Sequence, residues 1–459
     1  MRASLSLPCT IEEIFPLTPV QNFILDISRL TPSGLAFQQQ YTYYLTGDVD
    51  PQLVQESWEC IVARHPSLRT SFHCEGTSQS FQVVHDRAAL PFLYRDLRDL
   101  EENERTAAVF AWLMEDAKKP FDLLVPPLMR LALTRLEDRL FVLTLTMSHL
   151  IFDGWSLGAS FNLFAQTYAS LARGEEPDRT PFPSMHSYVT WYRQRETAED
   201  TAWWQERLRD AVLPRLPFMR VHEHTGPVEA DQIHHMVLDA EETAVLEQGA
   251  KSMGLTLNVL YQAAWALILS RLSPERRALM LTVAASRPME LEHIDQVFGV
   301  LIDGVPYNLH CPGDLQVEAW LGALRTLQLE SLEHQYTPIQ TWIQMGREPG
   351  TIPFNSYLIF ENHATGEGEK EDAAFSLTAA YMNSNLSFPL SMMVFPGPSL
   401  RVAIIYSSDY FSEDGILAFT ERLRATLKAL AANPGLSLDE VSALALLDEE
   451  HLTAREQGA

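Results

Sequence analysis

The chain has 459 residues, which is more than one ordinary hydrophobic core encloses, so its length predicts two domains or lobes. Apolar residues make up 46% and charged residues 20%, as in an ordinary globular protein. The net charge of −26 argues against nucleic acid and anionic membranes as partners, because phosphate groups carry the same sign.

The cysteines and the apolar segments predict a cytoplasmic protein that holds no metal. No two cysteines form a C-x-x-C pair, and none has a usual zinc spacing to a histidine, which fits reduced thiols. The N-terminus lacks the apolar run of a signal peptide, and the most apolar run, residues 259–269, is shorter than a membrane span. The four cysteines are Cys9, Cys60, Cys74 and Cys311.

Strand-like and helix-like segments alternate along the first part of the chain, which predicts an α/β class. Residues 37–47 are rich in strand formers, and residues 51–66 form a helix bounded by prolines. Residues 139–149 form a second strand. The helix at 156–174 follows from apolar side chains that recur every three or four positions.

The proline-rich, charged segment at 174–184 marks the predicted lobe boundary. We therefore expect an N-terminal lobe of residues 1–178 and a C-terminal lobe of residues 179–459. The second half repeats the alternation, with strands at 231–240 and 278–286, a buried helix at 256–273 and a polar, mobile loop at 361–374.

The strand at 139–149 delivers one histidine to its tip. By the two-residue alternation of a strand, His149 shares the more apolar face and points inward. Asp153 and Gly154 then turn the chain, and Ser156 can cap the following helix. An imidazole titrates near neutrality, so it could accept a proton from an attacking amine or hydroxyl. A lone histidine at a strand end is more often structural, so the short pattern leaves both roles open.

A second histidine pattern is the sequence from His234 and His235 to Asp239. Strand alternation continues straight through it, and no glycine follows the aspartate. We interpret it as an ordinary strand followed by a helix start, without catalysis.

The sequence S-H-L-I-F-D-G-W-S at 148–156 resembles the H-H-x-x-x-D-G signature of nonribosomal peptide synthetase condensation domains. That family belongs with the chloramphenicol acetyltransferase-like acyltransferases. Seven regions resemble the family's motifs in chain order, and together they make the resemblance specific. They are residues 15–25, 64–72 (R-H-P-S-L-R-T-S-F), 148–156, 188–192, 286–288 with 297–306, 334–340 and 354–362, and residues 444–457 resemble the linker that leads out of such a domain.

The resemblance implies two α/β, acetyltransferase-like lobes that form a V-shaped pseudo-dimer around a central tunnel. Donor and acceptor carrier proteins would dock at its two mouths and insert phosphopantetheine arms, so the domain itself would bind no cofactor. We expect a monomer without nucleic-acid or membrane partners.

The resemblance also assigns roles to residues. His149 matches the catalytic histidine, and Asp153 with Gly154 completes the catalytic group. Arg287 matches the arginine that pairs with the aspartate, and an arginine–carboxylate fork would fix the turn through two parallel hydrogen bonds. The amide at the Gly154 turn could polarise the developing oxyanion. Trp155 is expected to support the site by packing in the core.

Two positions depart from the family pattern. The first signature histidine is replaced by Ser148, on the opposite strand face from His149, so the base itself is retained. Serine here resembles terminal condensation domains of fungal synthetases, which cyclise and release a peptide, whereas D-G-W-S-L-G resembles chain-elongating domains. Asp303 replaces a common asparagine. It either lines the tunnel and selects a cationic or hydroxyl-bearing substrate, or is a solvated strand-end residue, which we favour.

The leading hypothesis is an acyltransferase that joins a carrier-bound thioester to a carrier-bound amine. The alternatives are ester or free-amine condensation, terminal macrocyclisation, and a non-catalytic docking module, which only Ser148 favours. Epimerisation domains share the histidine motif, but their additional signatures are missing here. Arg64 and Arg69 are candidates for carrier docking, or they only cap a helix and form surface salt bridges.

Overall fold

The computed structural model forms two compact units. The first consists of Met1–Arg195, Arg287–Ile302 and His363–Asn385, and the second of Glu196–Ser286, Asp303–Asn362 and Leu386–Ala459. The described residues are 10–31, 33–74, 80–195, 197–211, 216–219, 232–338, 341, 354–361, 375–386 and 388–446. Cys9, all but the first residue of the predicted loop at 361–374, and most of the linker-like segment at 444–457 lie outside them.

The two compact units do not correspond to the predicted division of the chain after residue 178. Residues 179–195 pack with the first unit, and two later segments return to it. A boundary read from local composition cannot detect such returns, because they depend on contacts between residues far apart in the chain. The assignment of residues 1–178 and 179–459 to two lobes stays a prediction.

The first unit is built on a five-stranded sheet in the order β12-β2-β7-β6-β5. Neighbouring strands are antiparallel except β5 and β6, which are parallel. The strands are β2 (Gln38–Gly47), β5 (Phe92–Asp96), β6 (Met129–Glu137), β7 (Leu140–Ser148) and β12 (Phe375–Ser384).

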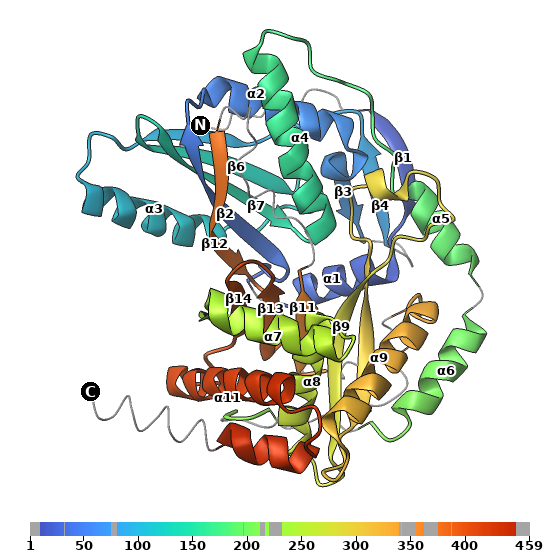
Figure 1. Ribbon diagram of the computed structural model, residues 1–459. Helices are drawn as coiled ribbons and strands as arrows, with labels where there is room; N and C mark the ends of the chain where they lie inside the picture. Colours follow the sequence, from blue (N-terminus) through green and yellow to red (C-terminus); the bar gives the residue numbers. More distant parts are fainter. Residues whose placement is uncertain are drawn as a thin grey trace. The chain divides into compact units, whose positions relative to one another are not determined.

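This sheet lies between α3 (Glu102–Ala117) on one face and the pair α2 (Pro51–Arg64) and α4 (Gly154–Ala172) on the other (Figure 1). On the α3 side, Thr146 of β7 donates a 2.7 Å hydrogen bond to Asp116. On the α4 side, the rings of Tyr43 and Phe161 lie 4.3 Å apart. Both faces of β7 are covered, so residues 141–148 are all buried.

A three-stranded sheet in the order β1-β4-β3 completes the regular structure of the first unit. The helix α1 beside it begins with a capping box, in which Thr18 and Gln21 satisfy each other's backbone amides. The remaining elements are β1 (Ile11–Pro16), α1 (Pro19–Leu30), η1 (Pro66–Arg69), β3 (Thr70–His73), β4 (Phe81–His85), α5 (His186–Gln194) and η2 (Ile294–Gln296).

The second unit contains a six-stranded sheet in the order β10-β9-β11-β13-β14-β8. Helix α8 is buried all round and packs on β9, α9 and α11. The strands are β8 (Gln232–Leu238), β9 (Arg277–Ala285), β10 (Ile302–His310), β11 (Ser356–Phe360), β13 (Leu390–Phe395) and β14 (Leu400–Tyr406). The helices are α6 (Ala198–Leu208), α7 (Ala240–Ser252), α8 (Leu257–Ser270), α9 (Val317–Glu333) and α11 (Glu413–Ala432).

The predicted strands and helices are present, with ends shifted by a few residues, and the α/β class is confirmed. His234 and His235 lie within β8, and Asp239 is the N-cap of α7, which confirms the structural interpretation of that pattern. No single helix among the described residues is long and apolar enough to cross a membrane; α7 and α8 qualify only as a pair bent by 96°.

Candidate active site

The candidate site is the loop of residues 149–153 between β7 and α4, in the first unit. The backbone amide of His149 donates to the carbonyl of Phe37, which fixes the start of the loop beside β2. Gln21 donates a 3.1 Å hydrogen bond to the carbonyl of Leu150. Residues 150–153 are buried, whereas His149 is partly exposed. The buried residues therefore anchor the loop in the first unit, and the histidine lies at its more exposed end.

The histidine ring is held in one orientation. Its Nδ1 lies 2.7 Å from the carbonyl oxygen of Phe152, and the two rings stack at 5.5 Å. A carbonyl oxygen only accepts hydrogen bonds, so Nδ1 carries the proton and Nε2 is the basic nitrogen of the neutral ring. Burial lowers the pKa of His149, and the negative charge of Asp153 opposes that effect. The hydrogen bond and the burial together favour a neutral imidazole with Nε2 as the proton acceptor.

Asp153 is buried and organises the start of α4. Its Oδ1 accepts hydrogen bonds from the backbone amide and the hydroxyl of Ser156, at 2.8 and 2.7 Å. Its Oδ2 accepts from the amide of Leu301 at 3.1 Å. The expectation that Ser156 caps this helix is therefore wrong: Asp153 is the N-cap, and the helix begins at Gly154. An aspartate at the cap both accepts the free amides and complements the helix dipole.

The predicted ion pair between Asp153 and Arg287 is present and buried. Nη2 of Arg287 lies 3.0 Å from each carboxylate oxygen, so one nitrogen serves both. The expected fork of two parallel bonds is wrong, since Nη1 is buried and has no hydrogen-bond partner among the described residues. The pair nevertheless ties residue 287 to the start of α4.

Trp155 occupies a different environment from the one predicted, whereas the Gly154 amide stays a candidate for oxyanion binding. Trp155 is 41% exposed rather than packed in the core; it donates to the carbonyl of Asp295, and its ring lies 5.4 Å from the Arg287 guanidinium carbon. Gly154 is the first residue of α4. The first amides of a helix have no intrahelical acceptor and carry partial positive charge, so the Gly154 amide can interact with a nearby oxyanion.

Ser148 lies on the sheet face opposite α4. It pairs with Gln38 in the antiparallel register, and the Gln38 side chain reaches the carbonyl of Ala117 in α3. Directly paired residues point to the same face. The Ser148 hydroxyl accepts from the amide of Leu150 at 3.3 Å, so it supports the loop.

Asp303 belongs to the second unit, at the start of β10. It is 3% exposed and accepts a 2.7 Å hydrogen bond from Ser286. The favoured interpretation of a solvated residue is therefore wrong, and the tunnel-lining role stays a prediction.

Arg64 and Arg69 are buried, which contradicts their proposed part in carrier docking. Arg64 donates to Thr180 and pairs with Asp178 at 2.7 Å. Arg69 pairs with Glu12 at 2.9 Å and donates to the carbonyl of His85. Both guanidinium groups hold segments of the first unit together.

Gln21 and the segment 298–301 lie in regions that resemble family motifs, but sequence reasoning gave them no role at the loop. The pattern Thr18-x-x-Gln21 is a visible capping signal, but its bond to the loop carbonyl depends on tertiary contacts. Gly299 donates to the Ser156 hydroxyl at 3.2 Å, and its φ of +151° is one that other residues rarely adopt. Within the described ranges, no cluster of three or more histidine, cysteine or acidic side chains could hold a metal ion.

Comparison with known proteins gives a coherent result. The family model described as "Condensation domain" matches residues 11–453. One of the linear gramicidin synthase proteins of Brevibacillus parabrevis is 29% identical over 436 residues, which cover 94% of this chain and 8% of that protein. Chondramide synthase of Chondromyces crocatus is 28% identical over 417 residues, which cover 90% of this chain and 10% of that protein. The chain thus spans only a small part of these relatives.

Solved structures share the fold. The first condensation domain of the calcium-dependent antibiotic synthetase superposes with a TM-score of 0.81 at 17% identity, covering 94% of this chain and 98% of that one. The X-domain from teicoplanin biosynthesis gives 0.78 at 20% identity, with coverage of 94% and 97%. The mixed α/β fold is therefore the chloramphenicol acetyltransferase-like fold of these domains. The V-shaped arrangement and the tunnel stay predictions.

Proposed function

We propose a function from the premise that this chain belongs to the condensation-domain family, whose members are parts of nonribosomal peptide synthetases. In this proposal, the domain joins a donor acyl or peptidyl thioester to an acceptor amine and forms an amide. Both substrates are carried on the phosphopantetheine arms of carrier proteins, and the domain binds no cofactor of its own. We place the reaction in the cytoplasm and the domain in a monomeric state.

The proposed chemistry needs one base and one oxyanion partner. The nitrogen of the acceptor amine attacks the thioester carbonyl carbon, and Nε2 of His149 accepts a proton from that amine. The C–N bond forms, the carbonyl oxygen becomes an oxyanion, and the Gly154 amide at the start of α4 donates to it. Collapse of the intermediate breaks the C–S bond, and the departing thiolate takes the proton from His149.

Asp153 supports this chemistry indirectly. It fixes the first turn of α4 and receives the cation of Arg287, so it sets where the Gly154 amide lies. Its negative charge also stabilises the imidazolium that forms during proton transfer. We therefore assign Asp153 and Arg287 to positioning and His149 to proton transfer.

The observation that carries the proposal is the hydrogen bond from His149 Nδ1 to the Phe152 carbonyl, because it leaves Nε2 as the base. The test is mass spectrometry of loaded donor and acceptor carriers incubated with the domain. We expect the acceptor carrier to gain the mass of the donor acyl group and the donor carrier to lose it. Unchanged masses across a panel of donor and acceptor pairs would contradict the proposal.

Macrocyclising release is a second candidate, favoured by Ser148 in place of the first signature histidine, and ester formation is a further alternative. The three chemistries separate by the newly formed bond: in a product released from its carrier, an amide survives mild hydroxylamine and an ester is cleaved, whereas cyclisation leaves an empty donor carrier and a free ring. Ser148 lies on the face opposite His149 in β7, so Ser148→Ala should change the rate by less than about threefold in any of them. If the domain were a docking module, the wild-type domain and the His149→Ala variant would bind the partner with equal affinity.

A further inference from the structure

His65 is a fully buried histidine held between two phenylalanine rings. Its ring lies 4.2 Å from that of Phe182 and 3.6 Å from that of Phe298, within 12° of parallel to both. Burial and the nearby charges of Arg64 and Arg69 lower its pKa to about 3, so the ring is neutral at ordinary pH. Neither ring nitrogen has a hydrogen-bond partner in the described part of the chain. Burying a polar ring whose nitrogens make no hydrogen bonds destabilises the folded state. A contribution to folding stability therefore does not explain why a histidine occupies this position.

One partner of the stack is joined directly to the candidate site. The carbonyl of Phe298 accepts a hydrogen bond from Ser67. The next residue, Gly299, donates to the hydroxyl of Ser156, which itself donates to Asp153. Three residues beyond Phe298, the Leu301 amide donates to the same carboxylate. The segment 298–301 is thus fixed at one end by the stack and at the other by Asp153.

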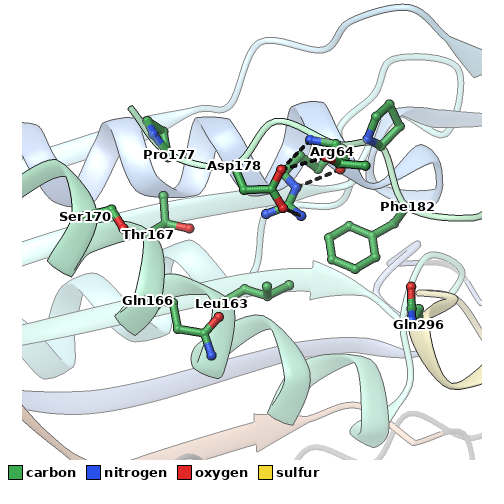
Figure 2. Close-up of a pocket in the computed structure, with 11 residues that line it drawn as sticks. Arg64, Leu163, Gln166, Thr167, Ser170, Pro177, Asp178, Phe182 and Gln296 are labelled. Atoms are coloured by element: carbon green, nitrogen blue, oxygen red, sulfur yellow. Dashed lines mark hydrogen bonds and ion pairs between the residues drawn. The ribbon is translucent and has the colours of Figure 1, made fainter. Parts of the chain in front are cut away.

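The other partner of the stack faces a pocket instead. Phe182 lines a pocket of about 610 Å³ together with side chains of α4, and the Arg64 guanidinium carbon lies 4.5 Å from the centre of its ring (Figure 2). Arg64 is itself held by Asp178 and by the carbonyl of Thr180, which restrains the Phe182 ring on this side. Phe298 is 4% exposed, and its backbone continues into the site. Movement of the stack toward Phe298 has to move the segment 298–301.

The slot between the two phenylalanines admits only a flat group. Their centroids are 6.4 Å apart, and the imidazole lies between them. An aromatic ring is roughly 3.5 Å thick, whereas a branched aliphatic side chain is broader, so leucine would push one wall outward.

From this geometry we propose that His65 is a positioning residue of the active site: its flat ring sets the place of segment 298–301, and through it the place of Asp153 beside His149. The proposal rests on the condensation activity proposed above for its kinetic consequence, but its structural consequence is independent of that activity.

The test compares His65→Leu with two controls. His65→Phe keeps a flat ring in the slot. Phe182→Leu removes a stacking ring from the side that is not joined to Asp153. We expect His65→Leu to lower kcat about 10- to 100-fold with KM within about twofold, as a shift of the order of 1 Å in a reacting group does. Both controls should retain kcat within about fivefold of wild type.

Amide hydrogen exchange supplies a readout that needs no turnover. In His65→Leu, the amides of Leu301 and Ser156 should exchange at least about tenfold faster, with the buried helix α8 unchanged as an internal reference. If His65→Leu fails to fold, Ser67→Ala removes the hydrogen bond to the Phe298 carbonyl more gently and should accelerate the same two amides.

The outcomes separate the two proposals. Faster exchange in His65→Leu with an inactive wild-type domain would support positioning and contradict the condensation activity. Unchanged exchange and unchanged kcat in His65→Leu would overturn the positioning role. Equal losses in His65→Leu and Phe182→Leu would also overturn it, because the stack would then act only as packing.

Discussion

Arg287 contacts both carboxylate oxygens of Asp153 through a single nitrogen, Nη2, at 3.0 Å each, although the two residues lie 134 positions apart in the chain. The pair is buried, with side-chain exposures of 9% and 1%. Asp153 also accepts hydrogen bonds from Ser156 and Leu301. One carboxylate therefore joins the helix that follows the loop 149–153 to a segment that arrives much later in the chain.

Breaking this pair should destabilise the protein strongly. Asp153→Ala leaves a buried cation without its partner, which typically costs about 3–5 kcal/mol of unfolding free energy. Arg287→Lys should cost much less, about 1–2 kcal/mol, because one nitrogen makes both contacts. Denaturant unfolding measures both. The control is Glu175→Ala, which removes an ion pair with Arg173 in which both side chains are more than half exposed, so it should change the unfolding free energy little. Equal losses of unfolding free energy in Arg287→Lys and Asp153→Ala would contradict the single-nitrogen contact.

His149→Ala should slow product formation by roughly a hundred- to ten-thousand-fold and leave the folded state intact, the usual effect of removing a general base. The matched control is His235→Ala, on the exposed face of β8, which should leave turnover nearly unchanged. Rates from carrier-bound product and unfolding curves should be measured for both variants. Similar rate losses in the two variants would show that His149 is wrongly assigned as the base.

The pH dependence of the rate should follow the titration of His149. Burial lowers the pKa of His149 below its ordinary value of 6.5. The base form is then lost only when the pH falls below that lowered pKa, so kcat/KM should be flat near neutrality and decline on the acid side of pH 6.5. A profile measured with loaded carriers tests this. A decline that begins above roughly pH 7 would show that the base is a different group or is less buried.

Gly299 should tolerate no side chain. Its φ of +151° is unfavourable for other residues, and a Cβ there would collide with the Met185 side chain. Gly299→Ala should lower stability by about 1–3 kcal/mol and reduce kcat, because the residue donates to Ser156 beside Asp153. Met185→Ala in the same chain removes the collision and leaves the backbone strain, so it should restore only part of the stability. Full recovery in the double variant would show that strain contributes nothing.

The sequence predicts the local elements well, because their signals are local. Pro51 after Asp50 marks the start of α2, and the apolar run at 257–270 forms the buried helix α8. The position of His149 at the end of β7 also follows from alternation and a turn. The motif resemblance brought Asp153 and Arg287 together, which no local pattern does.

The errors concern side-chain environments that distant segments decide. Trp155 lies beside Asp295 and Arg287 and stays partly exposed, whereas Asp303 is buried beside Ser286. Arg64 and Arg69 look like surface cations in a charged motif, but the fold buries both. The stacking of His65 is invisible in sequence for the same reason, because its two partners, Phe182 and Phe298, follow far later in the chain.

The central claim is that the neutral Nε2 of His149 promotes acyl transfer between two carrier-bound substrates. The most direct measurement is single-turnover mass spectrometry of both carriers, with wild type and His149→Ala compared at the same domain concentration. The account predicts that the acyl mass moves from the donor to the acceptor carrier with wild type and moves at least about a hundredfold more slowly with the variant. Equal transfer rates for the two proteins would contradict it.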